Sequence, residues 1–526
     1  MQTSPPNNIQ ARYRTLFWLF LAGITVVRLQ LAGKFGLGVD ESHYLLYSRH
    51  LAWGYFDHPP MVAFLAAITS RFGDSVLLVR LGPIVCSAIS LILLRYLALA
   101  LYRDERVGLW AAVLLHLMPY QHLLLVGLLP DATLNVFWCA TLLAVWRATQ
   151  TGRWSLWILT GIMFGGALLS KYHAVLLALC LLGYLTTSAG NRFWLKRAQP
   201  YVAALIGLAV FMPNILWNAR HDWISYLFQL GQGSGDGLDL GKFLTAVGGQ
   251  LAAWSPIIFV LLIVAFIVII RQPIISEADR FGIWTSVPLF VFFCLTGLTS
   301  KVLPHWTSAG WWTGSIVLAM VLLQKISHQN PSAKRWRRWS AAAAATGFFM
   351  TALLYVVLFL PVVGPVYSWT REVSVSLSQR FPAIKPLAPF ETGFDVSNEL
   401  FGWPEIARQT EIVRQQMPQP AKTFVFGHRF HPTSQLAVYL ARGTVATTLH
   451  HRYNQYRLWF APEEHVGWDA LFIVDQKRHQ KRADRYRPLF NRMDPQSAEI
   501  KIFRNDRLAQ TIRVYKYFGF KGKNED

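Results

Sequence analysis

Long apolar stretches are the feature of this sequence that most constrains its fold. A helix needs about 20 largely apolar residues to cross a bilayer, and such stretches recur throughout the first 360 residues. They predict a polytopic α-helical membrane protein with about eleven transmembrane helices, whose ends are uncertain by several residues. The expected spans are residues 13–32, 76–101, 108–127, 132–149, 156–169, 174–187, 201–217, 251–270, 281–298, 307–324 and 340–360.

Composition supports a membrane protein and argues against a nucleic-acid-binding protein. The chain is 53% hydrophobic and 15% charged, whereas soluble domains carry roughly 25% charged residues. A net charge of +22 is the kind of excess that nucleic-acid-binding domains show. Such domains do not need long apolar blocks, so we expect membrane lipids and no nucleic acid as partners. All four cysteines lie in expected spans, and no disulfide is expected.

The distribution of positive residues predicts the orientation. Cytoplasmic loops carry an excess of Lys and Arg. With the N-terminus inside, 16 of them fall on the cytoplasmic side of the first 360 residues and 7 on the outer side. An odd number of spans then places the C-terminal domain outside.

The pattern changes after Pro361, where apolar runs become short and charged residues frequent. We therefore expect two domains, a transmembrane domain over residues 1–360 and a small extracytoplasmic α/β domain over residues 361–526. The expected elements of the second domain are strands at 423–426, 445–449 and 470–474, a helix at 434–440 after the His431-Pro432 turn, and a terminal hairpin of 498–503 with 511–517.

The first outer loop holds the most informative polar residues. Asp40 and Glu41 directly follow the first span, and Asp57 and His58 precede two prolines. We expect two short helices at the membrane interface here, from Asp40 as N-cap to about residue 53, and from the prolines to about residue 73. Ionisable groups at membrane depth are usually functional, although helix capping is an equally simple role for the first acidic pair.

Three further outer turns place ionisable residues on the same side. They contain Asp131, then Lys171 with Tyr172, and then Lys301 with His305. A lone Lys can extend along apolar surface to the interface, and a lone His is more often a packed polar residue. Because acids from early loops and cations from later loops recur on one side, the set also fits an anionic lipid headgroup.

The order of these motifs resembles the membrane glycosyltransferases of the GT-C fold. The resemblance rests on the acidic pair at Asp40 and Glu41, the Phe56–Pro60 segment, the Pro130-Asp131 turn, the Ser170–Tyr172 turn and the Asn454–Trp459 segment. It is strongest to the bacterial branch related to protein O-mannosyltransferases and the lipid A aminoarabinose transferase.

The resemblance implies a transferase in the bacterial inner membrane. Such an enzyme moves a sugar, with inversion, from a polyprenyl-phosphate donor to lipid A, lipopolysaccharide core or another envelope glycan outside. Asp40 matches the family's catalytic acidic residue, with Glu41 beside it. No cofactor is expected, and a divalent metal, for which Asp57 is the candidate, is possible but not required. The implied donor- and substrate-binding residues are Arg49, Asp57, His58, Asp131, Lys171, Tyr172, Lys301 and His305, with Lys171, Lys301 and Arg49 as candidates for the leaving phosphate.

One departure and two alternatives remain open. In the aminoarabinose transferase a lysine precedes the paired prolines, whereas His58 stands there in this chain, which puts the same donor sugar in doubt. Protein O-glycosylation by the same mechanism is one alternative. A transporter or flippase for a lipid-linked sugar is the other; it predicts ionisable groups near the midplane, where this chain offers Arg28, Arg80 and Arg95.

Overall fold

The chain forms two compact units in the computed structural model. The model describes residues 6–233, 235, 237–327, 331–381, 385, 387, 395–475 and 479–523. The helical unit comprises Met1–Ala32 and Leu51–Leu353, and the mixed unit comprises Gly33–His50 and Leu354–Asp526. The short segment that carries Asp40 and Glu41 therefore folds with C-terminal residues that are hundreds of positions away.

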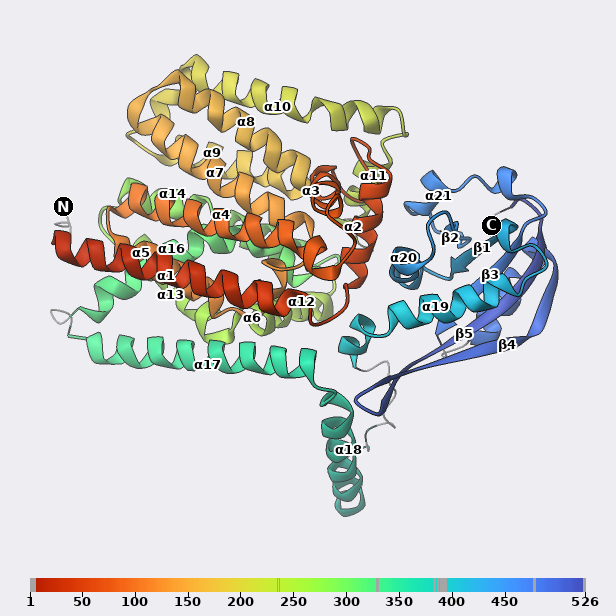
Figure 1. The fold of residues 1–526 in the computed structure, drawn as a ribbon. Coiled ribbons are helices and arrows are strands. Elements are labelled where there is room, and N and C mark those ends of the chain that lie inside the picture. The colour runs from red at the N-terminus through yellow and green to blue at the C-terminus, as the bar shows by residue number, and fades with distance from the viewer. Residues whose placement is uncertain are drawn as a thin grey trace. The chain divides into compact units, whose positions relative to one another are not determined.

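The helical unit has a helix at every position where the sequence predicts a span (Figure 1). Its helices are α1 (Asn7–Ala32), α3 (Met61–Ser70), α4 (Val76–Tyr102), α5 (Glu105–His116), α6 (Pro119–Leu124), α7 (Pro130–Thr151), α8 (Trp154–Ser170), α9 (Val175–Thr187), α10 (Ala198–Ala219), α11 (Ile224–Gly233), α12 (Leu240–Trp254), α13 (Pro256–Ile270), α14 (Glu277–Trp284), α15 (Val287–Thr296) and α16 (Ser308–Ile326), with the short 3-10 turns η1 (Tyr172–Ala174), η2 (Arg192–Lys196) and η3 (Pro304–Thr307); α17 (Ala333–Phe359) continues into the mixed unit.

Several of these helices have the length and apolarity of membrane spans. Within the described part of the chain, six helical stretches are long and apolar enough to cross a membrane, and a seventh is added if α12 and α13 form one span. The chain is thus a multi-pass membrane protein. The apolar stretch at 108–127 is interrupted, because α5 ends at His116 and α6 begins with Pro119, whose missing N–H cannot continue a helix.

Small residues let the short helix α8 approach its neighbour α10. A Cβ on Gly161 would collide with the carbonyl oxygen of Ala203, and one on Gly165 would collide with the side chain of Val210. Two glycines four residues apart lie on one face of a helix and allow close backbone packing in a membrane. This spacing explains how α8, which is short for a membrane span, still packs firmly between α7 and α10 (Figure 1).

The arginines inside the expected spans have protein partners. Arg28 donates to Ser87 Oγ at 2.7 Å, and Arg80 donates to the carbonyl of Ala32 at 2.6 Å. Arg95 forms an ion pair with Glu105, with Nε 2.8 Å from Oε2. Because buried charges are stable only when they are bonded or paired, these contacts give each arginine a structural role.

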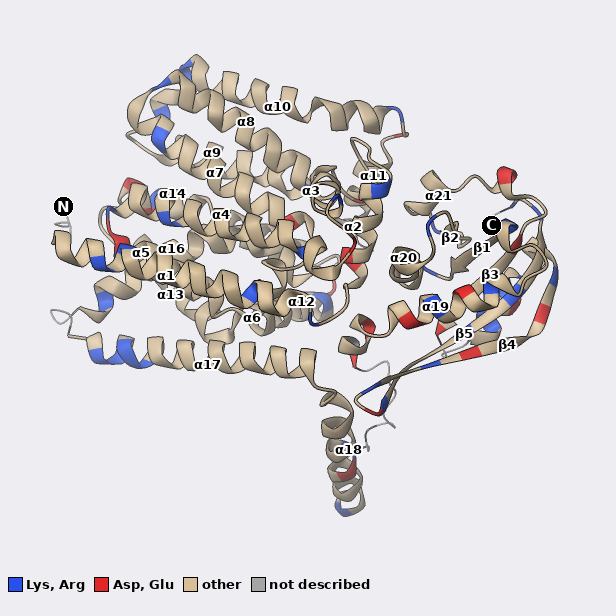
Figure 2. Ribbon diagram, in the orientation of Figure 1, with Lys and Arg blue, Asp and Glu red and all other residues tan. Residues whose placement is uncertain are grey.

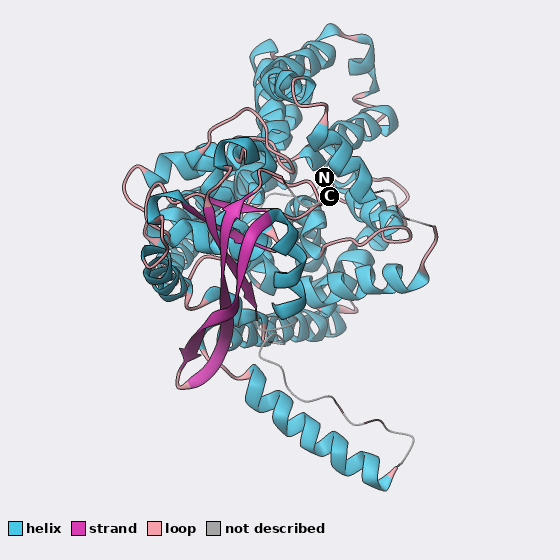
Figure 3. Cartoon of the chain, turned by 90° about the vertical axis from the view of Figure 1, so that its right-hand side faces the viewer, coloured by secondary structure: helices cyan, strands magenta, loops and turns pink. Residues whose placement is uncertain are grey.

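The mixed unit is built around a five-stranded sheet (Figure 3). The strand order is β2-β1-β3-β5-β4, in which β1 runs parallel to both β2 and β3 while β5 is antiparallel to β3 and β4. Its elements are α2 (Val39–Arg49), α18 (Val363–Arg380), η5 (Val396–Leu400), α19 (Trp403–Gln415), η6 (Pro420–Lys422), β1 (Thr423–Gly427), α20 (Phe430–Tyr439), β2 (Ala446–Thr448), α21 (Tyr456–Trp459), η7 (Pro462–His465), β3 (Asp469–Asp475), α22 (His479–Tyr486), η8 (Arg487–Leu489), β4 (Phe490–Arg504) and β5 (Arg507–Phe520).

The two faces of this sheet are covered by different helices. Side chains alternate along a strand, so Val425 packs on one face with Leu436 of α20. On the opposite face Phe426 packs with Tyr486 of α22. All expected strands are present, the hairpin is longer than predicted, and the helix begins at Phe430 rather than after Pro432. A proline is accepted there because the first helical turn needs no N–H donor.

Candidate active-site residues

The two members of the acidic pair that follows α1 lie in different surroundings. We expected Asp40 to cap the helix, but Gly38 is the N-cap and α2 starts at Val39. The carboxylate of Glu41 accepts a hydrogen bond from the Gly38 N–H at 2.8 Å and is buried, whereas Asp40 is exposed. Helix capping therefore explains Glu41. Asp40 also lies in the first turn of α2, where a carboxylate compensates the helix dipole.

Helix α2 ends at Arg49, earlier than the expected end near residue 53, and it is held by α20. Ser42 donates to Gln435 Oε1 at 2.9 Å, and the amide of Gln435 donates to the Leu37 carbonyl at 2.9 Å. His43 Nδ1 lies 3.1 Å from Ser434 Oγ. These buried polar contacts hold the first turn of α2 against α20. They thereby also hold the backbone of Asp40 in place.

Arg49 has a structural partner in the same unit. Its guanidinium donates to the carbonyls of Ala437 and Val438, both at 3.2 Å, near the C-terminal end of α20. A cation at this position satisfies carbonyls that the helix leaves without a partner. The assignment of Arg49 to a leaving phosphate stays a prediction.

In the helical unit, Asp131 and Lys171 form a buried ion pair. Asp131 lies in the first turn of α7, and Lys171 directly follows α8. The Lys171 Nζ is 3.0 and 2.8 Å from the two carboxylate oxygens, and Ser308 donates to one of them at 2.9 Å. Both ionic side chains are less than a tenth exposed. Because the carboxylate compensates the ammonium charge, Lys171 offers a phosphate less positive potential than an unpaired lysine would.

His305 belongs to the same group of side chains. It interacts electrostatically with Asp131, and its Nδ1 lies 3.4 Å from the hydroxyl of Tyr120. Tyr172 follows Lys171, and its hydroxyl oxygen lies 3.5 Å from the amide nitrogen of Asn214. Lys301, in the segment before η3, is exposed.

Asp57 and His58 lie in a loop that is tied to neighbouring helices. His58 Nδ1 is 3.1 Å from Asp57 Oδ2. Gln229 of α11 donates to the Asp57 carbonyl at 2.7 Å, and Asn214 of α10 donates to the Trp53 carbonyl at 2.8 Å. No group of three His, Cys, Asp or Glu side chains placed to hold a metal ion occurs among the residues that the structure describes. Metal dependence stays a prediction.

The structure thus brings several of the predicted residues together in two sets, one per unit. Arg49 shares α2 with the acidic pair. In the helical unit Asp131 and Lys171 form an ion pair, and His305 lies within electrostatic range of both. The sequence reasoning did not identify Ser308 and Gln435, which bond to residues of these sets. Each is separated from its partner by more than 170 positions, and no local pattern marks such a contact.

Comparison with known proteins decides the fold. Residues 57–217 match the family model described as dolichyl-phosphate-mannose-protein mannosyltransferase. ArnT from Cupriavidus metallidurans in the apo state aligns with a TM-score of 0.62 at 15% identity, over 95% of this chain and 98% of ArnT. The same enzyme bound to undecaprenyl phosphate gives 0.60 at 16% identity, over the same shares of the two chains. This chain has the GT-C fold.

A curated relative extends the comparison to the sequence level. The lipid A galacturonosyltransferase RgtD of Rhizobium johnstonii is 26% identical over 296 residues, which are 55% of this chain. The match spans 61% of the length of RgtD. The fold expected from the sequence is confirmed by the alignment with ArnT, which covers both the helical and the mixed unit.

Proposed function

We propose that this protein is a glycosyltransferase that uses a polyprenyl-phosphate sugar donor at the outer face of a bacterial inner membrane. The acceptor is an envelope glycan such as lipid A or lipopolysaccharide core. The observation that carries the proposal is the exposed carboxylate of Asp40, directly before a Glu41 that caps the helix, in a chain with the fold of ArnT. The sequence match to RgtD, named as a lipid A galacturonosyltransferase, supports the acceptor class.

The chemistry is a single displacement at the anomeric carbon. An acceptor oxygen forms the new bond to this carbon from the face opposite the phosphate, and the carbon–oxygen bond to the polyprenyl phosphate breaks. If the acceptor is a hydroxyl, Asp40 takes its proton; if it is a phosphate, the carboxylate only positions it. The leaving phosphate departs as an anion, so it needs cations rather than a general acid.

The charge distribution supports the orientation that this function requires. Lys and Arg gather at the end of the helical unit where α1 and α17 begin (Figure 2). The positive-inside rule assigns this end to the cytoplasm. In this orientation the turns with Asp131, Lys171 and Lys301, at the opposite helix ends, face outward.

A transporter fits the observations less well. It needs ionisable groups near the midplane that can engage a substrate. Arg28, Arg80 and Arg95 instead bond to protein groups within the helical unit.

The proposal is tested by mass spectrometry of envelope lipids and of polyprenyl-phosphate sugars from strains with and without the protein. We expect one envelope glycan to lose a sugar in the deletion strain while the matching polyprenyl-phosphate sugar accumulates. If the envelope glycans are unchanged and glycopeptides are lost from the proteome, the acceptor is a protein instead of an envelope glycan. Glycolipid that changes leaflet without any change in glycosidic bonds would contradict the transferase.

A further inference from the structure

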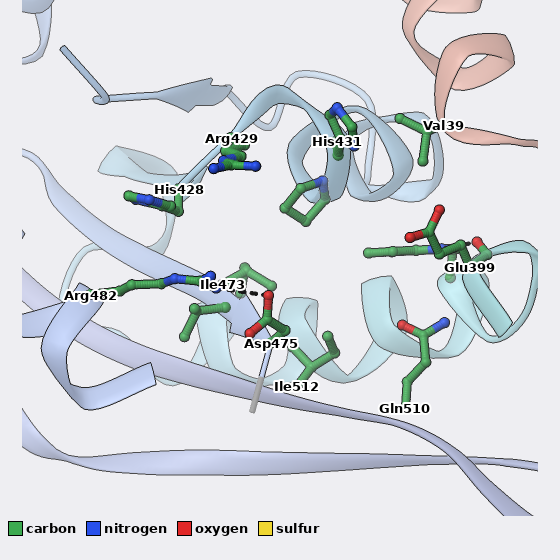
Figure 4. Close-up of a pocket in the computed structure, with 13 residues that line it drawn as sticks. Val39, Glu399, His428, Arg429, His431, Ile473, Asp475, Arg482, Gln510 and Ile512 are labelled. Carbon is green, nitrogen blue, oxygen red and sulfur yellow. Dashed lines mark hydrogen bonds and ion pairs between the residues drawn. The ribbon is translucent and has the colours of Figure 1, made fainter. Parts of the chain in front are cut away.

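The mixed unit contains a pocket that the proposed chemistry does not use. It has a volume of about 240 Å³ and lies beside the carboxyl ends of β1 and β3 (Figure 4). This is below the ~300–1,000 Å³ typical of pockets for drug-sized ligands, so it accommodates one small group. Its lining includes Trp403, Ile473 and Ile512 as an apolar floor.

The topology of the sheet places this pocket where α/β folds bind ligands. Strands β1 and β3 are parallel neighbours in the centre of the sheet. The helix after β1, α20, covers one face, and the helix after β3, α22, covers the other. Where successive helices leave adjacent strands toward opposite faces, a crevice opens outside the carboxyl ends of these strands.

One side of the pocket is basic. Figure 4 shows His428, Arg429 and Arg482 grouped on this side. Asp475 Oδ2 accepts from Arg482 Nη1 at 2.7 Å. That bond fixes the guanidinium and offsets part of its charge, and it leaves most of its five donors for other partners, while Arg429 contributes the second cation. Arg429 is exposed.

The surroundings add to the positive potential on this side. Residues 479–487, which the structure describes, carry four Lys and Arg against one acid. Burial lowers the pKa of His428 to about 4, with a further lowering by Arg482, Arg429 and Arg485. The imidazole is therefore neutral at pH 7 and can share hydrogen bonds with a polar ligand.

The other side of the pocket offers neutral or weakly acidic hydrogen-bonding groups. Glu399 and Gln510 lie there, opposite the arginines (Figure 4). The amide nitrogen of Gln510 donates to the Asn398 and Phe401 carbonyls, so its Oε1 is the group that can accept from a ligand hydroxyl. Burial raises the pKa of Glu399, which lowers the cost of keeping its carboxyl group protonated. A ligand that spans the pocket thus meets cations at one end and hydroxyl-binding groups at the other.

We propose that this pocket binds a phosphorylated sugar, with the phosphate on Arg429 and Arg482 and the sugar hydroxyls toward Glu399 and Gln510. Planar guanidinium groups match phosphate oxygens in geometry as well as charge. Val39 also lines the pocket, and Asp40 follows it in the chain. We identify this ligand as a phosphosugar of the glycan acceptor, an identification that rests on the proposed function.

Calorimetric titration of the full chain in detergent micelles tests the pocket. Glucose 1-phosphate, inorganic phosphate and glucose are the three titrants. We expect glucose 1-phosphate to bind best, and Arg429→Gln to weaken its binding by roughly tenfold or more, the usual effect of losing one hydrogen bond to a charged group. Arg429→Lys, which keeps the charge, should retain part of the affinity. Arg442→Gln, three residues beyond the other end of α20, is the matched control and should bind as the wild type does.

Equal affinities for glucose and glucose 1-phosphate would contradict the assignment of the pocket to a phosphorylated sugar. Equal affinities of the wild type and Arg429→Gln for glucose 1-phosphate would contradict it as well. Lipid A added to the micelles should displace glucose 1-phosphate, and failure to do so would overturn the acceptor role. Asp40→Asn should bind glucose 1-phosphate normally, so loss of the transfer chemistry and loss of the pocket are observed separately.

Discussion

At the scale of single residues, two adjacent acids differ in what surrounds them. Glu41 is buried and bonded to the backbone of Gly38, while Asp40 is exposed one position earlier. The sequence alone could not separate them, because both types of acid are favoured in the first turn of a helix. The separation depends on which carboxylate reaches back to the N-cap, and only the three-dimensional structure shows that.

Removal of the Glu41 carboxylate should therefore affect stability. Glu41→Ala leaves the Gly38 N–H without its acceptor, and we expect a loss of about 0.5–2 kcal/mol, the range for helix N-cap interactions. Glu41→Gln keeps an acceptor oxygen and serves as the control. Thermal unfolding in detergent measures both variants, and equal melting temperatures for Glu41→Ala and the wild type would contradict the capping role.

His428 should make the stability depend on pH. Its pKa is lowered to about 4 in the folded chain, first by burial and then by Arg482, Arg429 and Arg485, against an ordinary value near 6.5. Between these two values the unfolded chain binds more protons at this site than the folded chain. Stability is therefore lost as the pH falls from about 6.5 to 4.

The variant His428→Asn removes this titration. We expect its melting temperature to fall less between pH 7 and pH 5 than that of the wild type. Equal falls in the two proteins would contradict the assignment.

At the scale of elements, the position of α2 depends on one fully buried amide. Gln435 accepts from Ser42 and donates to the Leu37 carbonyl, so it joins α20 to the first turn of α2 and to the chain two residues before α2 begins. Gln435→Leu leaves these groups without partners, which costs about 1–3 kcal/mol for a buried polar group.

Because Gln435 acts through the position of Asp40, Gln435→Leu should lower kcat more than it raises KM for the donor. The exposed Gln415→Leu on α19 is the control and should change neither. If the Gln435→Leu variant loses stability but keeps the wild-type kcat, Gln435 has a structural role only.

The ion pair between the start of α7 and the end of α8 supports a second prediction at this scale. Asp131→Leu leaves the Lys171 charge buried without its carboxylate, and breaking such a pair costs about 3–5 kcal/mol. The double variant with Lys171→Met removes both charges and should regain most of the lost melting temperature. A double variant no more stable than Asp131→Leu alone would contradict the pairing.

Elements were more predictable from the sequence than contacts between them. The long apolar blocks predicted the helices of the helical unit. Short apolar runs at 423–426 and 470–474 predicted the strands that the structure has at 423–427 and 469–475. The predicted helix ends were less accurate. The residues around Pro119 remain apolar, so the sequence predicted one span over 108–127, whereas α5 ends at His116 and a new helix begins at Pro119. The bond from Ser42 to Gln435 joins residues 393 positions apart, and no periodicity encodes such a pairing.

At the scale of the whole molecule, the GT-C fold extends over both units, and the Asp40 carboxylate lies in the segment that follows α1. The alignment with ArnT covers 95% of the chain, so it includes the units that carry both sets of predicted residues. The sequence anticipated this architecture because membrane spans are encoded by composition over long windows. It did not anticipate that Gly33–His50 would group with the C-terminal residues.

The most direct test of the central claim is the rate of sugar transfer by purified Asp40→Asn. The assay measures transfer from a polyprenyl-phosphate sugar to the acceptor found by envelope mass spectrometry. If the acceptor is a hydroxyl, loss of the base should lower kcat by about 10²–10⁴-fold, with an unchanged melting temperature. Asp74→Asn, which changes an exposed acid between α3 and α4, is the matched control and should transfer at the wild-type rate. Transfer by Asp40→Asn at the wild-type rate would contradict the account.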